Sequence, residues 1–305
     1  MEKIECNGTT WINIEEVTSQ DADYLGKSFD FHPLDLKDCL GAPQRAKTDI
    51  YDHYLFIILH FPYLDVANNV LRSSDLNIFI TKTHIITVQK RPISFLHDLF
   101  LDCKKNTDAR MQSFLKSPDL FLYYILDRLY HQSLTIIDEL YRYINATEEY
   151  IFGQKGRIAV RNIAEARRNN LAMRALLNPQ RLVINTLAHI QKDWFNKEGE
   201  TTLYYDDILD YLEKNWIFLE NQKELIEGLN ETNQTLLTYK SNAVITILTV
   251  FSVAILPLTL LTGLYGMNIP LPFAEEPRVI WLLFLLVASV TLGLIYYILS
   301  RKEWI

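Results

Sequence analysis

The chain is poor in cysteine, with only Cys6, Cys39 and Cys103 among its 305 residues. No two of them form a C-x-x-C pair, so the sequence holds no zinc-ribbon or dithiol motif. A small, odd number of cysteines is typical of a reducing compartment rather than of a disulfide scaffold. The first residues, MEKIECNGTTW, also lack the apolar run of a signal peptide. We therefore expect the N-terminal part of the chain to stay in the cytoplasm.

Basic residues are in the minority, with 30 Lys and Arg against 37 Asp and Glu and a formal net charge of −7. A general nucleic-acid-binding protein would carry a basic excess, so we expect no nucleic-acid partner. The sequence also lacks a P-loop, the G-x-G-x-x-G and G-x-S-x-G patterns, and the H-E-x-x-H pattern of zinc proteases. We find no catalytic constellation, and expect neither an enzyme nor a resident cofactor.

Charge disappears almost completely near the C-terminus. The mean hydropathy of the chain is 0.00, but this average combines a charged part, 1–240, with an apolar part, 241–305. A helix that spans a bilayer needs about 20 apolar residues. We therefore predict transmembrane helices at 241–264 and 279–300. The alternative is a buried helical hairpin in a soluble core, but soluble cores seldom contain two such runs.

The residues around the two spans predict their orientation. The chain is basic just outside the spans, at Lys240, Arg301 and Lys302, whereas the loop between them, 265–278, carries Glu275 and Glu276. Basic residues favour the cytoplasmic side of a membrane. We predict a multi-pass protein of the cell (inner) membrane with both termini, including the basic tail 301–305, in the cytoplasm.

The soluble part changes character along the chain. Within 1–110, four runs have β-branched and aromatic content at strand length: TTWINIEE, YLFIILHF, LNIFITK and HIITVQK. Between the first two, DADYLGKSF and PLDLKDCL are typical of helices. We predict a small cytoplasmic α/β domain over 1–110, followed by a long-helix cytoplasmic region over 111–240.

Apolar residues at helical spacing predict three long helices, at 119–152, 157–195 and 201–264. The last continues from the cytoplasmic region into the first span. No small domain can bury so long a helix, so we expect its apolar seam to pack against copies of itself. The seam comprises Leu209, Leu212, Trp216, Leu219, Ile226, Leu229 and Leu236.

Carboxylates share another face of the same helix, at Asp206, Asp210, Glu213, Glu220, Glu224, Glu227 and Glu231. Two interpretations stay open. A solvated outer face is the commoner meaning of such a stripe. A surface that attracts cations towards a pore is the functional alternative.

The first span ends in Tyr265-Gly266-Met267-Asn268. In this place the sequence resembles the CorA family of magnesium channels, whose signature is the tripeptide Gly-Met-Asn. Pro257-Leu258-Thr259 resembles the Pro-Leu-Thr turn that precedes the signature in the family. The His-Pro-Leu, Gln-Arg and Tyr-Asp-His-Tyr-Leu-Phe stretches at 32–34, 44–45 and 51–56 resemble its cytoplasmic domain. The resemblance therefore covers nearly the whole chain.

This resemblance implies an α+β cytoplasmic domain followed by long stalk helices and two C-terminal transmembrane helices, assembled as a homopentameric channel. The first span would line the pore, and the second would face lipid. Mg²⁺ would be both the transported ion, driven inwards by the membrane potential, and the regulatory ion that closes the channel from the cytoplasm.

Two alternatives stay open. The same fold carries Co²⁺ and Ni²⁺ in some relatives, and Zn²⁺ in a branch whose signature has valine where this chain has Met267. A membrane-anchored sensor or scaffold is an alternative from another class.

The signature suits a strongly hydrated ion. Magnesium sheds its water reluctantly, so a ring of neutral oxygens suits its passage better than bare carboxylates. Asn268 offers an amide oxygen, and Gly266 lets a backbone carbonyl approach closely. One loop cannot enclose an ion, but a symmetric ring of loops can. We expect Gly266, Met267 and Asn268 to form the selectivity filter, supported by Tyr265 and Pro257.

Counting back from the signature at helical steps predicts a pore-lining face of the first span. It comprises Asn242, Ile245, Leu248, Ser252, Leu256 and Thr259. These positions match pore residues of the family when aligned without a gap. Asn242 and Thr259 would contact hydrated ions, and the apolar middle would form a constriction that can lose its water. For Pro257, a bend in the pore helix and a tolerated kink are both open.

The family also has cytoplasmic cation sites between subunits. Tyr204-Tyr205-Asp206-Asp207-Ile208 resembles the stretch that carries one acidic ligand, and Asp207 is the matching position. We name Asp75 as the candidate for its partner in the N-terminal domain. An exposed aspartate on a helix is the alternative for Asp207.

Overall fold

The computed structural model describes residues 1–6, 8–65, 67–105, 117–153, 156–190, 192, 195, 201–268 and 276–301. The chain divides into two compact units, Met1–Glu231 and Thr232–Ile305. Glu275 and Lys302, which the sequence analysis names, lie outside the described residues.

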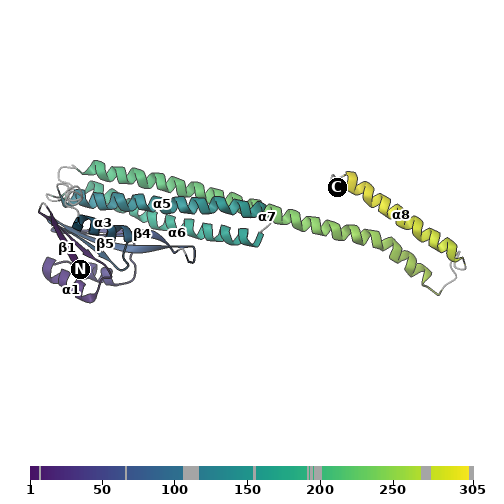
Figure 1. The fold of residues 1–305 in the computed structure, drawn as a ribbon, viewed down its shortest axis with the longest axis horizontal. Helices are drawn as coiled ribbons and strands as arrows, with labels where there is room; N and C mark the ends of the chain where they lie inside the picture. Colours follow the sequence, from purple (N-terminus) through teal and green to yellow (C-terminus); the bar gives the residue numbers. More distant parts are fainter. Residues whose placement is uncertain are drawn as a thin grey trace. The chain divides into compact units, whose positions relative to one another are not determined.

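A six-stranded sheet forms the centre of the first unit, in the order β1-β2-β6-β5-β4-β3 (Figure 1). Its strands are β1 (Glu2–Cys6), β2 (Thr9–Ile14), β3 (Lys47–Ile50), β4 (Tyr54–Asp65), β5 (Val70–Thr81) and β6 (His84–Gln89). β2 and β6 are parallel, and the other neighbours are antiparallel. The four predicted strands are confirmed. The sequence analysis missed β1 and β3, which are short, charged edge strands with little apolar alternation.

Helices cover both faces of the sheet. Leu55 and Ile57 of β4 belong to one apolar cluster, together with residues of the helices at 94–105, 118–152, 156–189 and 202–265. Phe56 and Ile58 belong to a second cluster, together with residues of the helices at 19–29 and 33–40. The bounds of the smaller helices are α1 (Ser19–Phe29), α2 (Pro33–Leu40) and α3 (Ser94–Lys105). Burial on both faces explains why β4 is a continuous apolar run. Helices α1 and α2 are confirmed, and α3 was not predicted.

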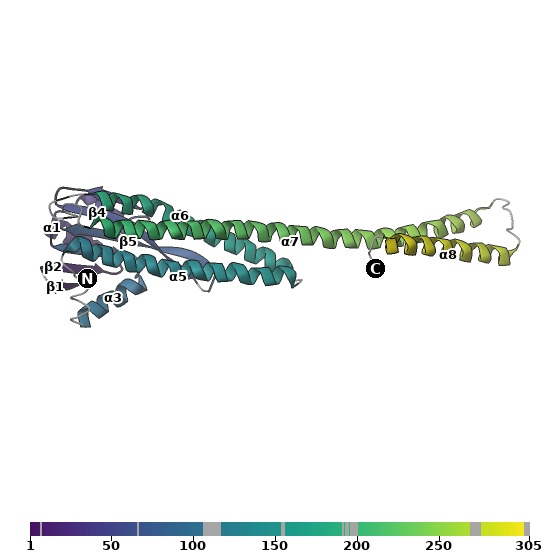
Figure 2. The ribbon, with the colours of Figure 1, turned by 90° about the horizontal axis from the view of Figure 1, so that it is seen from above.

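Three long helices, α5 (Pro118–Phe152), α6 (Gly156–His189) and α7 (Thr202–Tyr265), confirm the predicted helical region. Within the first unit they lie side by side along the sheet (Figures 1 and 2). The predicted helix 157–195 is too long, since α6 ends at His189. Lys192 and Phe195 exchange two backbone hydrogen bonds of 2.9 and 3.1 Å, and Phe195 is fully buried. These hydrogen bonds and the burial of Phe195 hold the chain in a non-helical conformation after His189.

The apolar seam of α7 is covered by helices of the same chain. Leu212, Leu219 and Ile226 are buried. The Nδ2 of Asn170 on α6 donates to the Leu219 carbonyl at 3.0 Å, and the Nε2 of Gln222 donates to the Ile137 carbonyl on α5 at 3.0 Å. The expectation that this part of the seam packs against copies of itself is wrong, because α5 and α6 already bury it.

The second unit contains the end of α7 and α8 (Pro277–Arg301), which form a helical hairpin (Figure 2). Each helix contains an apolar window of mean hydropathy 2.5, and none of the residues in either window is buried. This exposure contradicts a buried core hairpin and is the pattern of helices that face lipid or other copies of the chain.

Candidate functional site

The six predicted pore positions lie on one exposed side of α7. Half-buried positions of the same span recur on another side, at Thr246, Val250, Ala254, Pro257, Leu258, Leu261 and Tyr265. With 3.6 residues per turn, the centres of the two sets are roughly 180° apart. Gly263, which the sequence analysis did not name, is exposed on the predicted pore side, one turn beyond Thr259.

Helix α8 shows a matching half-buried face, at Val279, Ile280, Leu283, Phe284, Val287, Ala288, Thr291 and Ile295. Within the described part of the second unit, α7 and α8 are the helices present, so these faces turn towards each other. The predicted pore side of α7 therefore faces away from α8. Pro257 lies on the α8 side, so its ring does not belong to the pore side.

The hydroxyl groups on the predicted pore side donate their protons to carbonyls within α7. Ser252 donates to the Leu248 carbonyl at 2.9 Å, and Thr259 donates to the Ile255 carbonyl at 3.0 Å. Because each proton is used inside the helix, the oxygen of each hydroxyl presents lone pairs outwards. Water molecules around a cation point their hydrogens outwards and can donate to these oxygens. Thr259 and Ser252 can thus contact a hydrated cation.

The signature residues form a turn directly after α7. The N–H of Gly266 donates to the Thr262 carbonyl at 2.9 Å, and the N–H of Met267 donates to the Leu264 carbonyl at 3.2 Å. A Cβ at Gly266 would lie 3.0 Å from the Thr262 oxygen, so glycine permits this close approach. Met267 and Asn268 are exposed. The Asn268 amide is therefore available at the end of the helix.

Glu276, one of the two predicted loop acids, is exposed at the start of α8. Its carbonyl accepts the N–H groups of Val279 and Ile280 at 3.0 and 3.3 Å. An acid at a helix N-terminus is stabilised by the helix dipole. Glu276 thus directly precedes α8, and its side chain is exposed.

Part of the acidic face of α7 is paired within the first unit. Glu213 forms an ion pair with Arg181, and Glu220 forms one with Arg174, both from α6. The guanidinium carbons of these two arginines lie 5.0 Å (Arg174) and 5.9 Å (Arg181) from the ring centre of Trp216. These two acids therefore join α7 to α6, a role that neither sequence interpretation considered. The two arginines are seven residues apart, as are the two glutamates, and this matching spacing could have indicated the pairing from the sequence.

The two residues named for the regulatory site have different surroundings. Asp207 is exposed on α7, and burial together with the carboxylates of Asp127 and Asp207 raises the pKa of Tyr123 on α5. Asp75 on β5 is bonded to His60 Nδ1 at 2.8 Å and lies 3.8 Å from Lys90 Nζ. Among the described residues no group of three or more His, Cys, Asp or Glu could hold a metal. The described part of one copy thus does not bring a metal-ligand set together.

Known proteins resemble this chain over most of its length. The cobalt/magnesium transport protein CorA of Thermotoga maritima is 26% identical over 302 residues, which cover 97% of this chain and 83% of that protein. The zinc transport protein ZntB of Pectobacterium atrosepticum is 23% identical over 299 residues, with coverages of 97% and 88%.

Among solved structures, the complete CorA magnesium transporter from Methanocaldococcus jannaschii superposes with a TM-score of 0.84 at 19% identity, covering 100% of this chain and 95% of that one. This similarity confirms the predicted α+β domain, long helix and two C-terminal apolar helices. The family model for CorA-like Mg²⁺ transporter proteins matches residues 7–302, so the chain belongs to this family of membrane transporters, as its signature indicated.

Proposed function

We propose that this protein carries hydrated Mg²⁺ into the cell through a pore that α7 lines. The observation that carries the proposal is the arrangement of α7 in the second unit. Its side with Asn242, Ser252 and Thr259 faces away from α8, and the same helix ends in the exposed Asn268 turn. Copies arranged around an axis would bring these sides together and keep α8 outside.

Transport would need no ATP and no resident cofactor. A divalent ion that crosses a potential of about 100 mV gains about 4.6 kcal/mol, which suffices to concentrate it inside. Thr259 and Asn268 would accept hydrogen bonds from the ion's water, and Ile245, Leu248 and Leu256 would form a constriction that can lose its water. These roles are supported by the exposure of all five side chains. We propose no catalytic role for the chain.

We propose a homopentamer with both termini in the cytoplasm, as the family resemblance implies. A single chain supplies one Asn268, so the filter requires several copies. Cytoplasmic Mg²⁺ would close the channel by bridging Asp207 to a carboxylate of a neighbouring copy. Asp75 is the less suitable partner, since its carboxylate is bonded to His60 at 2.8 Å and only about 10% exposed.

Co²⁺ is the second candidate ion, because the relative from Thermotoga maritima is a cobalt/magnesium transport protein. Zn²⁺ is supported by the ZntB relative. The signature of the zinc branch has valine in place of methionine, however, so Met267 argues against Zn²⁺. Neutral oxygens hold the outer water shell and discriminate weakly among hydrated divalent ions. Parallel influx assays with Mg²⁺, Co²⁺, Ni²⁺ and Zn²⁺ rank the four ions.

Influx into proteoliposomes tests the proposal. The vesicles contain the full chain and a magnesium dye, start without internal Mg²⁺, and receive a negative-inside potential. We expect Mg²⁺ influx with the wild type and its loss in Asn268→Ala. Absence of influx for all four ions would refute the channel and favour a membrane-anchored sensor or scaffold. Influx that survives Asn268→Ala would keep the channel but refute the filter.

A further inference from the structure

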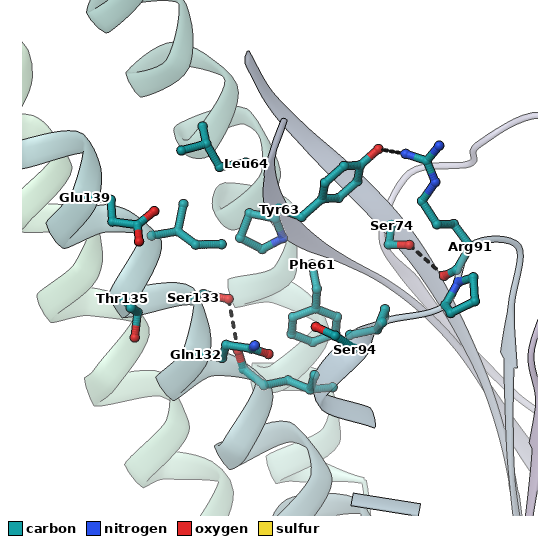
Figure 3. A pocket seen from close by; sticks show the side chains of 15 residues that line it. Phe61, Tyr63, Leu64, Ser74, Arg91, Ser94, Gln132, Ser133, Thr135 and Glu139 are labelled. Atoms are coloured by element: carbon teal, nitrogen blue, oxygen red, sulfur yellow. Dashed lines mark hydrogen bonds between the residues drawn. The ribbon is translucent and has the colours of Figure 1, made fainter. Parts of the chain in front are cut away.

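A cavity of about 580 Å³ lies entirely within the first unit and includes none of the candidate pore residues. Figure 3 shows its walls. They come from the end of β4 (residues 61–64), the segment that leads into α3 (residues 91–94), and one face of α5 (residues 129–139). Cavities that bind small molecules typically have volumes of about 300–1,000 Å³. The size therefore fits a small organic ligand.

The deepest residues that line the cavity are apolar. Phe61, Ile93 and Leu129 are buried. The hydroxyl of Ser133 donates to the Leu129 carbonyl at 3.0 Å, and that of Ser74 donates to the Arg91 carbonyl at 2.8 Å (Figure 3). These hydroxyl protons are used within the protein. A ligand would thus meet an apolar middle section in which the hydroxyls of Ser74 and Ser133 already donate to backbone carbonyls.

The two sides of the cavity carry opposite charges. Figure 3 shows Arg91 on one side and Glu139 on the other. The guanidinium of Arg91 donates to the Tyr63 hydroxyl, and its central carbon lies 5.2 Å from the Tyr63 ring centre. Within the described residues, no carboxylate pairs with Arg91 and no cation pairs with Glu139. Both charged groups are thus available to a ligand.

Neutral polar groups accompany each charge. Ser94, the first residue of α3, lines the cavity beside Arg91, and the first N–H groups of a helix lack partners within the helix. Thr135 on α5 precedes Glu139 by one helical turn and also lines the cavity. The side with Arg91 therefore suits a carboxylate, and the side with Glu139 suits an ammonium group.

We propose that this cavity binds a zwitterion whose ammonium and carboxylate groups are separated by an apolar spacer. Arg91 would hold the carboxylate, and Glu139 would hold the ammonium group. Arg91 and Glu139 are both exposed at the edges of the cavity, so a ligand with one charge would form only one of the two ion pairs and would bind more weakly. An ω-amino carboxylate and a short peptide with free termini both supply this chemistry.

Calorimetric titration of the full-length protein in detergent tests the proposal. The probes are ω-amino carboxylates of increasing length and alanine peptides of increasing length with free termini. Alkylamines and alkyl carboxylates of equal length provide the singly charged comparison. We expect binding at one preferred length in at least one zwitterionic series, and binding at least tenfold weaker for the singly charged compounds. The series that binds more tightly identifies the source of the ligand.

Four variants connect binding to the cavity. Arg91→Gln and Glu139→Gln should each weaken binding about tenfold. Arg142→Gln and Glu148→Gln change the same charges at exposed positions of α5 outside the cavity, and should bind like the wild type. Absence of binding for every zwitterion, equal binding of singly charged probes, or binding unchanged in both cavity variants would each overturn the proposal. Unchanged thermal unfolding of all four variants excludes loss of folding as the cause.

Discussion

The Oγ1 of Thr259 donates its proton to the carbonyl of Ile255 at 3.0 Å, one turn back along α7. This hydrogen bond leaves the hydroxyl oxygen as an acceptor on the exposed side of the helix that faces away from α8. A hydrated cation presents donors, and this oxygen can accept from them. The contribution of Thr259 to the proposed pore can therefore be tested by a substitution that keeps the shape of the side chain.

Thr259→Val removes this acceptor and keeps the branched side chain. We expect magnesium influx into proteoliposomes to fall roughly two- to tenfold, the effect of losing about one net hydrogen bond to the hydrated ion. Thr259→Ser keeps the acceptor and should retain most of the influx. Thr291→Val removes a hydroxyl that donates within α8 and serves as the matched control. Equal influx in Thr259→Val and the wild type would exclude Thr259 from the ion path.

Gly266→Ala tests the turn that carries the filter. The added Cβ would lie 3.0 Å from the Thr262 carbonyl oxygen, so the turn must move and the Asn268 amide moves with it. We expect magnesium influx to fall severalfold while the protein is still inserted in the vesicles. An added Cβ at Gly293 on α8 meets no atom within 4 Å, so Gly293→Ala should transport normally. Normal transport in Gly266→Ala would show that the turn tolerates this displacement.

Gln222→Ala tests how α7 is held in the first unit. The buried side chain donates to the Ile137 carbonyl at 3.0 Å and contacts Asn170 Nδ2 at 3.4 Å. Removing it takes away these two contacts of α7 with α5 and α6, and one net hydrogen bond contributes about 1 kcal/mol. We expect a lower thermal unfolding temperature for the variant. Asn221→Ala, an exposed neighbour, should change it little, and equal effects of the two substitutions would contradict the assignment.

The lowered pKa of Glu165 predicts that the stability of the protein depends on pH. Hydrogen bonds from Arg161, Asn69 and Tyr143 lower the pKa of its carboxyl from the ordinary 4.5 to about 2. A lowered folded-state pKa stabilises the protein fully above the unfolded-state value, and this contribution is lost as the pH falls from about 4.5 towards 2. Glu165→Gln should therefore reduce the free energy of unfolding at neutral pH more than at pH 3.

Chemical denaturation of the full chain in detergent at the two pH values measures this difference. Glu148→Gln, on the exposed surface of α5, provides the control for a general effect of charge. A loss of stability in Glu165→Gln that is equal at both pH values would contradict the lowered pKa.

Much of the architecture could be predicted from local pattern. Period or length specifies the kind of element in three cases: the apolar runs of β4 and β6, the three long segments with helical spacing, and the two uncharged spans. The edge strand β3, with the sequence KTDI, carries no such pattern and forms because β4 offers it backbone partners. The end of α6 likewise depends on the buried anchor Phe195.

The sequence by itself determined the family, through the Gly-Met-Asn signature between two apolar runs, and it predicted the six pore positions through their helical spacing. Only the tertiary structure decided which neighbours these residues have. It turned the predicted pore side of α7 away from α8, paired Glu213 and Glu220 with arginines of α6, and bonded Asp75 to His60. The physical reason is that periodicity specifies which residues share a face, whereas the partner of a face depends on contacts between segments far apart in the chain.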